Sequence, residues 1–140
     1  MAIDFRDAAE RHFEDAGYLE AGNRPANADH LFGLSAECAL KTVMQGLGMA
    51  LRSDGAPDQK QYRVHINHIW GEFAAFSQNR SGAKYSSYID PMNNSFSDWD
   101  VSQRYCHRND ITSDMLTRHK EGAEQTKQML DTAILDGVVK

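Results

Sequence analysis

The chain has 140 residues, a mass of 15.7 kDa and a formal net charge of −5. This length fits one domain with one hydrophobic core, and the net negative charge argues against a general coat for nucleic acid, because non-specific affinity comes from Lys and Arg. No apolar run approaches the roughly 20 residues that cross a bilayer, and the acidic amino end is atypical of a signal peptide. We therefore expect one cytoplasmic domain over residues 1–140.

The charges are distributed unevenly along the chain. Residues 60–108 carry six basic and four acidic side chains, whereas acidic side chains outnumber basic ones on both flanks. The same middle section holds three of the six histidines. We expect any anionic ligand to bind there, because a local excess of positive charge attracts it.

Taken in chain order, the first two predicted elements are helices. Residues 4–20 have apolar residues at steps of three and four, with Asp4 as candidate N-cap. A longer and more buried helix follows, with Pro25 near its start and stop signals at Gly46 and Gly48. Both patterns indicate helices that bury an apolar face.

The second half of the chain contains two further predicted helices. A third helix is predicted within residues 62–82, and residues 82–98 are predicted to form a long loop with a helical turn. The last helix begins at the sequence ITSDM, where Thr112 or Ser113 can cap it. Because no stretch alternates with period two, we expect an all-α, up-and-down bundle of four to five helices.

Three short motifs follow one another along these elements. An apolar helix carries Glu and Lys four residues apart, a His precedes the next apolar helix, and a W-x-V-x-x-R-Y stretch comes later. The residues concerned are Glu37, Leu40, Lys41, His65, Trp99, Arg104 and Tyr105. In this order they resemble the HEPN family of small helical domains, over roughly residues 5–135.

The resemblance implies a function and a set of partners. Many HEPN proteins are metal-independent ribonucleases, often the toxin of a toxin–antitoxin pair or part of a defence system. The family site pairs an Arg with a His near the final helices, with four to six residues between them, often at a dimer interface. The resemblance therefore implies RNA or a nucleotide as ligand, an antitoxin or other protein as partner, a homodimer, and no cofactor.

Arg104 and His107 are the catalytic residues that this resemblance suggests. An imidazole can move protons near neutral pH, and a guanidinium can neutralise charge on a phosphate. The chain departs from the family pattern, because only two residues separate Arg104 from His107; a helix would still place them on one face. Three other pairs fit the family spacing, but in parts of the chain that the family does not use: Arg6 with His12, Arg24 with His30, and Arg63 with His68. The expected binding residues are Glu37, Lys41, His65, Tyr105 and Arg108.

Other interpretations of the same residues remain open. Arg104 can instead pair with Glu37 or Asp100, and Glu37 with Lys41 can be a structural pair at the edge of the core. Trp99 and Tyr105 are typical of core aromatics with a hydrogen-bonded polar tip. The alternative function is therefore a non-catalytic domain that binds a nucleotide, a nucleic acid or a protein and carries a degenerate Arg/His motif.

The remaining candidates concern metal binding and carboxylates. His65 and His68 could bind a metal together with Cys106 and His107, although Cys38 and Cys106 lack CxxC spacing and are expected to be free thiols. Three carboxylates near the WDVSQRY motif are expected to be solvated caps rather than a hydrolase pair, namely Asp98, Asp100 and Asp110. Whether the protein is an enzyme stays open at this point.

Overall fold

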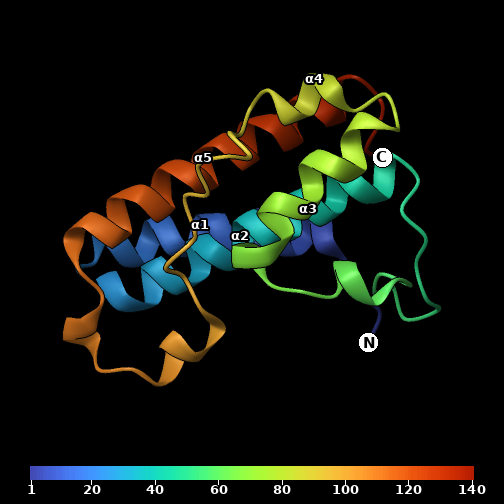
Figure 1. Cartoon of the computed structure of the whole chain (residues 1–140). Helices are drawn as coiled ribbons and strands as arrows, with labels where there is room; N and C mark the ends of the chain where they lie inside the picture. The colour runs from blue at the N-terminus through green and yellow to red at the C-terminus, as the bar shows by residue number, and fades with distance from the viewer.

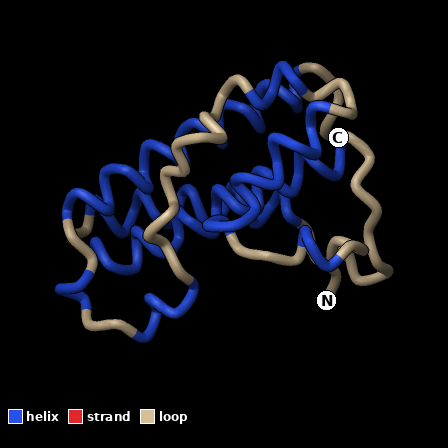
Figure 2. Tube along the Cα trace, viewed as in Figure 1, coloured by secondary structure: helices blue, strands red, loops and turns tan.

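The computed structural model describes residues 1–140 and is all-α, which confirms the predicted fold class. Its five α-helices are α1 (Phe5–Ala21), α2 (Pro25–Gly46), α3 (Ile66–Gln78), α4 (Ala83–Ser86) and α5 (Ser113–Leu135) (Figure 1). Three short 3₁₀ turns lie between them: η1 (Lys60–Tyr62), η2 (Val101–Tyr105) and η3 (Arg108–Asp110). No strand is present, as Figure 2 shows, and a single antiparallel bridge joins Leu51 to Pro57.

The ends of the first two helices follow from the predicted signals. The side chain of Asp4 accepts a hydrogen bond from the backbone N–H of Asp7, so it caps α1 as expected. Pro25 is the first residue of α2, where its missing N–H costs nothing. Arg24, the N-cap of α2, makes no side-chain capping bond, so the first N–H groups of this long helix lack a side-chain cap.

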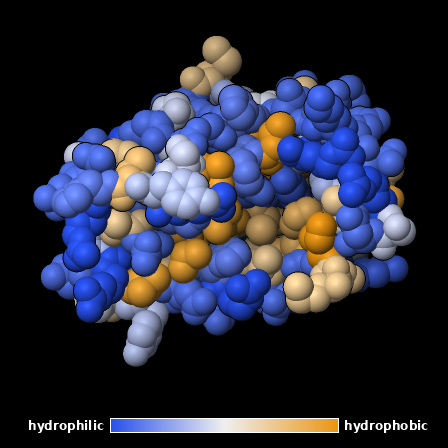
Figure 3. Space-filling model, turned by 90° about the horizontal axis from the view of Figure 1, so that it is seen from below, coloured by the Kyte–Doolittle hydropathy of each residue, from blue (hydrophilic) through white to orange (hydrophobic).

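Helix α2 lies at the centre of the bundle and packs against α1, α3 and α5. Most of its residues are buried, which is expected of a helix that is covered on several sides. The core around it joins 26 buried residues, and its largest fully buried side chains include Trp70, Trp99, Phe32 and Phe73. One face of the molecule still has apolar residues in a hollow between hydrophilic rims (Figure 3).

Helix α3 is shorter than the sequence predicts. It begins at Ile66 rather than near Tyr62, because His65 has an extended backbone and residues 60–62 form the separate turn η1. It ends at Gln78 rather than at Gly82, and Ser81 adopts a left-handed conformation (φ 60°) that an α-helix does not allow. The apolar stripe thus predicted the helix correctly, but both predicted ends of the helix were wrong.

The last predicted elements agree with the structure. Between α3 and α5 the chain forms the short helix α4 and otherwise turns, as expected for the loop. Thr112 caps α5, since its hydroxyl oxygen accepts the backbone N–H of Met115 at 3.1 Å. No helix of the structure is both long enough and apolar enough to cross a membrane.

Candidate functional site

The stretch that carries Arg104 and His107 is not one helix. Turn η2 is held by a capping box. The side chain of Asp100 accepts the backbone N–H of Ser102, and the side-chain oxygen of Gln103 accepts the backbone N–H of Asp100. The chain then becomes extended at Cys106 (φ −76°, ψ 161°), and His107 caps the separate turn η3. The helical i, i+3 relation expected for Arg104 and His107 is therefore wrong.

In Figure 1 these two turns lie below the start of α2. Residues of the two turns and of the start of α2 line an open pocket. The pocket has a volume of about 870 Å³. Arg104 and His107 both line it, although they belong to different turns. The other lining residues are Asn23, Arg24, Pro25, Ala26, Asn27, His30, Gln103, Cys106, Arg108, Asn109 and Ile111. We call this cavity the basic pocket.

The basic pocket has positive side chains and no carboxylate in its lining. Its three arginines, Arg24, Arg104 and Arg108, are exposed and none of them forms an ion pair within the chain. The alternative pairing of Arg104 with Glu37 or Asp100 is therefore wrong. The guanidinium of Arg104 lies over the Tyr105 ring instead, 4.9 Å from its centroid.

His107 is held in one tautomer by its capping role. Its Nδ1 atom accepts the backbone N–H of Asn109 at 3.1 Å. A ring nitrogen that accepts carries no proton, so in the neutral ring the proton lies on Nε2. As placed, His107 can donate one hydrogen bond from Nε2 to a ligand.

His30 is a second imidazole in the basic pocket. Its ring stacks on Trp99, with centroids 5.4 Å apart and planes within 11°, and its buried Nδ1 has no hydrogen-bond partner. Burial, and then the charge of Arg104, lower its pKa below the usual 6.5, so the ring is neutral at neutral pH. His30 was not among the site residues expected from the sequence, although the spacing between Arg24 and His30 matches the Arg/His spacing of the family site.

Glu37, Lys41 and His65 form a separate cluster that does not line the basic pocket. Lys41 Nζ lies 3.2 Å from one Glu37 oxygen and His65 Nδ1 lies 2.9 Å from the other. Glu37 and Lys41 are buried, so they form the structural pair that the alternative interpretation expected. The hydrogen bond to Glu37 raises the pKa of His65. Of the expected binding residues, only Arg108 lines the pocket.

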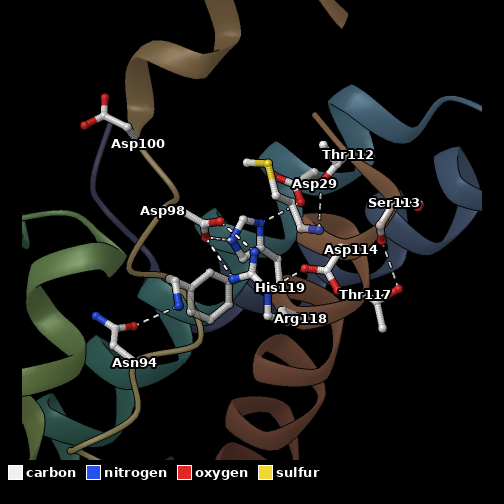
Figure 4. A network of polar contacts seen from close by, with 12 residues as sticks. Asp29, Asn94, Asp98, Asp100, Thr112, Ser113, Asp114, Thr117, Arg118 and His119 are labelled. Carbon is white, nitrogen blue, oxygen red and sulfur yellow. Dashed lines mark hydrogen bonds and ion pairs between the residues drawn. The ribbon is translucent and has the colours of Figure 1, made fainter. Parts of the chain in front are cut away.

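A partly buried polar network holds the loop that carries two of the pocket arginines, Arg104 and Arg108 (Figure 4). His119 Nδ1 lies 2.6 Å from an Asp29 oxygen and its Nε2 lies 2.8 Å from Asp98. Arg118 donates two hydrogen bonds to Asp98, at 3.0 and 2.6 Å, and holds the pKa of that carboxyl well below its usual range. Asp98 is exposed as expected, but its carboxylate pairs with Arg118 and His119 and caps no helix, so the capping role expected for it is wrong.

The network reaches the basic pocket through Gln103. The second oxygen of Asp29 accepts from Gln103 Nε2 at 2.7 Å, and Gln103 lines the pocket. Asp29 and His119 have no exposed surface. The two ring nitrogens of His119 face carboxylate oxygens of Asp29 and Asp98, so the ring links these two residues. The network thus joins Gln103 of η2 to α2, and Asp98, which precedes η2, to α5.

The aromatic residues of the motif lie in different surroundings. Trp99 is buried as expected, but its Nε1 lacks a hydrogen-bond partner. Tyr105 is 78% exposed, so the interpretation of Tyr105 as a core aromatic is wrong. Cys38 is buried and Cys106 exposed, and both are free thiols as expected.

No group of three or more His, Cys, Asp or Glu side chains is placed to hold a metal ion, so the metal alternative for His65, His68, Cys106 and His107 is wrong.

Comparisons of the chain with protein-family models, with curated proteins and with solved structures found no match.

Proposed function

We propose that the basic pocket binds the phosphate groups of RNA or of a nucleotide. One observation carries this proposal: in a protein with a net charge of −5, three arginines without acidic partners line a pocket that contains no carboxylate. A guanidinium left without a partner is free to form a bidentate pair with phosphate. The arginines therefore supply both the charge and the geometry that a phosphate needs.

The start of α2 adds to the attraction for an anion. Asn23, Arg24, Pro25, Ala26 and Asn27, around the helix start, line the pocket, and no side chain caps the first N–H groups. The positive end of a helix dipole favours a bound anion. Phosphate in this pocket would thus meet backbone donors as well as the three guanidinium groups.

Metal-independent RNA cleavage is the second candidate, because two imidazoles share the pocket with Arg104. In this reaction the 2′-oxygen gives its proton to a base and bonds to phosphorus, while the bond to the 5′-oxygen breaks and that oxygen takes a proton. Neutral His30 can accept the first proton. To donate the second, His107 must first gain a proton on Nδ1, which displaces the Asn109 N–H. Binding without cleavage is therefore the better supported function.

Binding is tested by fluorescence anisotropy with a labelled RNA strand at several salt concentrations. Arg104→Ala and Arg108→Ala should each weaken binding and reduce the slope of log K against log salt by about 0.7 for each lost phosphate contact. Arg52→Ala removes the same charge outside the pocket and should leave the slope unchanged. Equal affinity of all three variants and wild type would contradict the proposal.

A thiol-labelling experiment locates the ligand independently. Burial raises the pKa of Cys38 to about 12, so an alkylating reagent should modify Cys106, which is exposed and lines the basic pocket. RNA or a nucleotide should slow this modification, and Cys106→Ser should abolish it. Unchanged labelling at saturating ligand would place the binding site elsewhere.

Cleavage is tested on the same protein with RNA in the presence of a chelator. If the second candidate is correct, His30→Ala and His107→Ala each abolish product formation while RNA binding persists. If wild-type protein binds the RNA but does not cleave it, cleavage is excluded and only the binding function stands.

The HEPN resemblance adds a homodimer and an antitoxin or other protein partner to the proposal. Sedimentation velocity distinguishes the 15.7 kDa monomer from a dimer.

A further inference from the structure

We propose that Tyr105 is a stacking platform for a base, so that the ligand of the basic pocket is single-stranded nucleic acid. This inference rests on the proposed phosphate binding and adds the part of the ligand that the arginines do not contact. The evidence is an exposed aromatic ring on a well-fixed turn, in contact with the guanidinium of Arg104, a residue that lines the pocket.

Tyr105 is exposed in a way that the fold itself does not explain. Its side chain is 78% exposed and its hydroxyl has no hydrogen-bond partner within the chain. The structure has only one more tyrosine with such exposure, Tyr18 on α1, and that residue does not border the basic pocket. Tyr105, by contrast, lies in the sequence between Arg104 and Cys106, and both of these residues line the basic pocket.

Arg104 connects the ring to the pocket. Its guanidinium lies 4.9 Å from the Tyr105 centroid, and the same residue lines the pocket. Contact with the ring restricts the long arginine side chain, because a cation over a ring face is attracted to it. A phosphate bound by Arg104 is therefore held beside the ring, and the nucleoside attached to that phosphate comes within its reach.

The backbone beneath Tyr105 is well fixed. Asp100 and Gln103 close η2 with reciprocal capping bonds, and Gln103 is bonded to the buried Asp29. A ring mounted on such a turn loses little conformational freedom when a base stacks on it, since only its own side-chain torsions remain to be restricted. This pre-organisation is what distinguishes Tyr105 from an aromatic residue on a flexible loop.

The exposed ring selects for single strands. In a duplex the faces of each base are covered by neighbouring bases, whereas unstacked bases of single strands pack onto aromatic rings and guanidinium planes. Every base has such a face, so we expect little sequence preference. The 2′-hydroxyl is not part of this contact, and single-stranded DNA of the same length should also bind.

The test compares four ligands by fluorescence anisotropy: a short RNA strand, its DNA counterpart, an abasic strand of equal length and an RNA duplex. Tyr105→Leu should weaken binding of the two base-bearing strands about five- to a hundredfold and leave the abasic strand unaffected. Tyr105→Phe should bind as wild type does, because the ring is kept. Tyr18→Leu, at an equally exposed tyrosine, should change nothing.

The outcomes separate this inference from the proposed function. If Tyr105→Leu binds the RNA strand as tightly as wild type while Arg104→Ala and Arg108→Ala bind it weakly, the stacking role is wrong and phosphate binding stands. Tighter binding of the duplex than of the single strand would also overturn the inference. If wild type binds none of the four ligands, the inference is wrong and the RNA part of the proposed function is wrong as well.

Discussion

Gly33 has no room for a side chain, because the Trp99 indole lies against its backbone. A Cβ atom at this position would lie 2.1 Å from Trp99 Nε1. We expect Gly33→Ala to displace the indole and to lower the free energy of unfolding by about 1–3 kcal/mol, as measured by urea denaturation.

A second helical glycine provides the control for this substitution. Gly17 lies within α1, is exposed, and has no atom within 4 Å of an added Cβ. Gly17→Ala should therefore raise the free energy of unfolding by up to about 1 kcal/mol, because alanine favours a helix over glycine. A loss of stability in both variants would show that Trp99 is not the cause.

His65 makes the stability of the protein depend on pH near neutrality. The hydrogen bond that His65 donates to the Glu37 carboxylate raises the pKa of His65 above the usual value of 6.5. Its contribution to stability is therefore complete below about pH 6.5 and is lost as the pH rises through the higher pKa of the folded state. His65→Gln should remove this part of the pH dependence in urea titrations between pH 5 and pH 9.

An NMR titration of the His65 ring measures the shift directly. The expected midpoint lies above 6.5, because the charged ring is favoured beside the Glu37 carboxylate. A midpoint below 6.5 would mean that burial outweighs the hydrogen bond, and the pH dependence of stability would then have the opposite sign.

At the scale of elements, the network of Asp29, His119, Asp98 and Arg118 joins α2, α5 and the loop between α4 and α5. Asp29→Ala should cost about 3–5 kcal/mol of unfolding free energy, because it leaves a buried imidazole without one of its two partners. Asp114→Ala removes an exposed partner of Arg118 and should cost less than about 1 kcal/mol. Thermal unfolding of the two variants gives the comparison, and equal losses would contradict a structural role for the buried contacts.

The sequence predicted those elements best whose ends are marked by local chemistry. Asp4, Pro25 and Thr112 mark the starts of α1, α2 and α5, and each helix begins where its signal lies. The stretch from Val101 to Asp110 was the least predictable, since 3₁₀ turns are too short to show periodicity. Its two turns depend on contacts with α2 and α5 that lie far away in the sequence.

The candidate site was predictable only in part, for the same reason. Arg104 and His107 stood out because their motif resembles that of a family, but their neighbours Arg24 and His30 come from the other end of the chain. His119 occupied an apolar position of the last helical stripe and resembled a core residue, so its pairing with Asp29 left no local signal. Long-range contacts decide which polar residues meet.

At the scale of the whole molecule, stability is expected to be distributed unevenly between helices. Helix α2 has buried residues along most of its length, whereas Ala9 and Ala16 are the only buried residues of α1. Few buried apolar contacts favour local opening. In hydrogen exchange followed by mass spectrometry, α1 amides should exchange faster than those of α2; equal protection of both helices would indicate that the bundle opens only as a unit.

The network around His119 also has a consequence for the order of events during synthesis. The two walls of the basic pocket are separated by more than 70 residues. Gln103 of the second wall is bonded to Asp29 of α2, and the α5 side chains of Arg118 and His119 hold Asp98 and Asp29. A nascent chain that has not yet released α5 from the ribosome has the arginines but lacks the α5 side chains that hold Asp29 and Asp98. Ligand binding should therefore become fully established only after α5 has emerged.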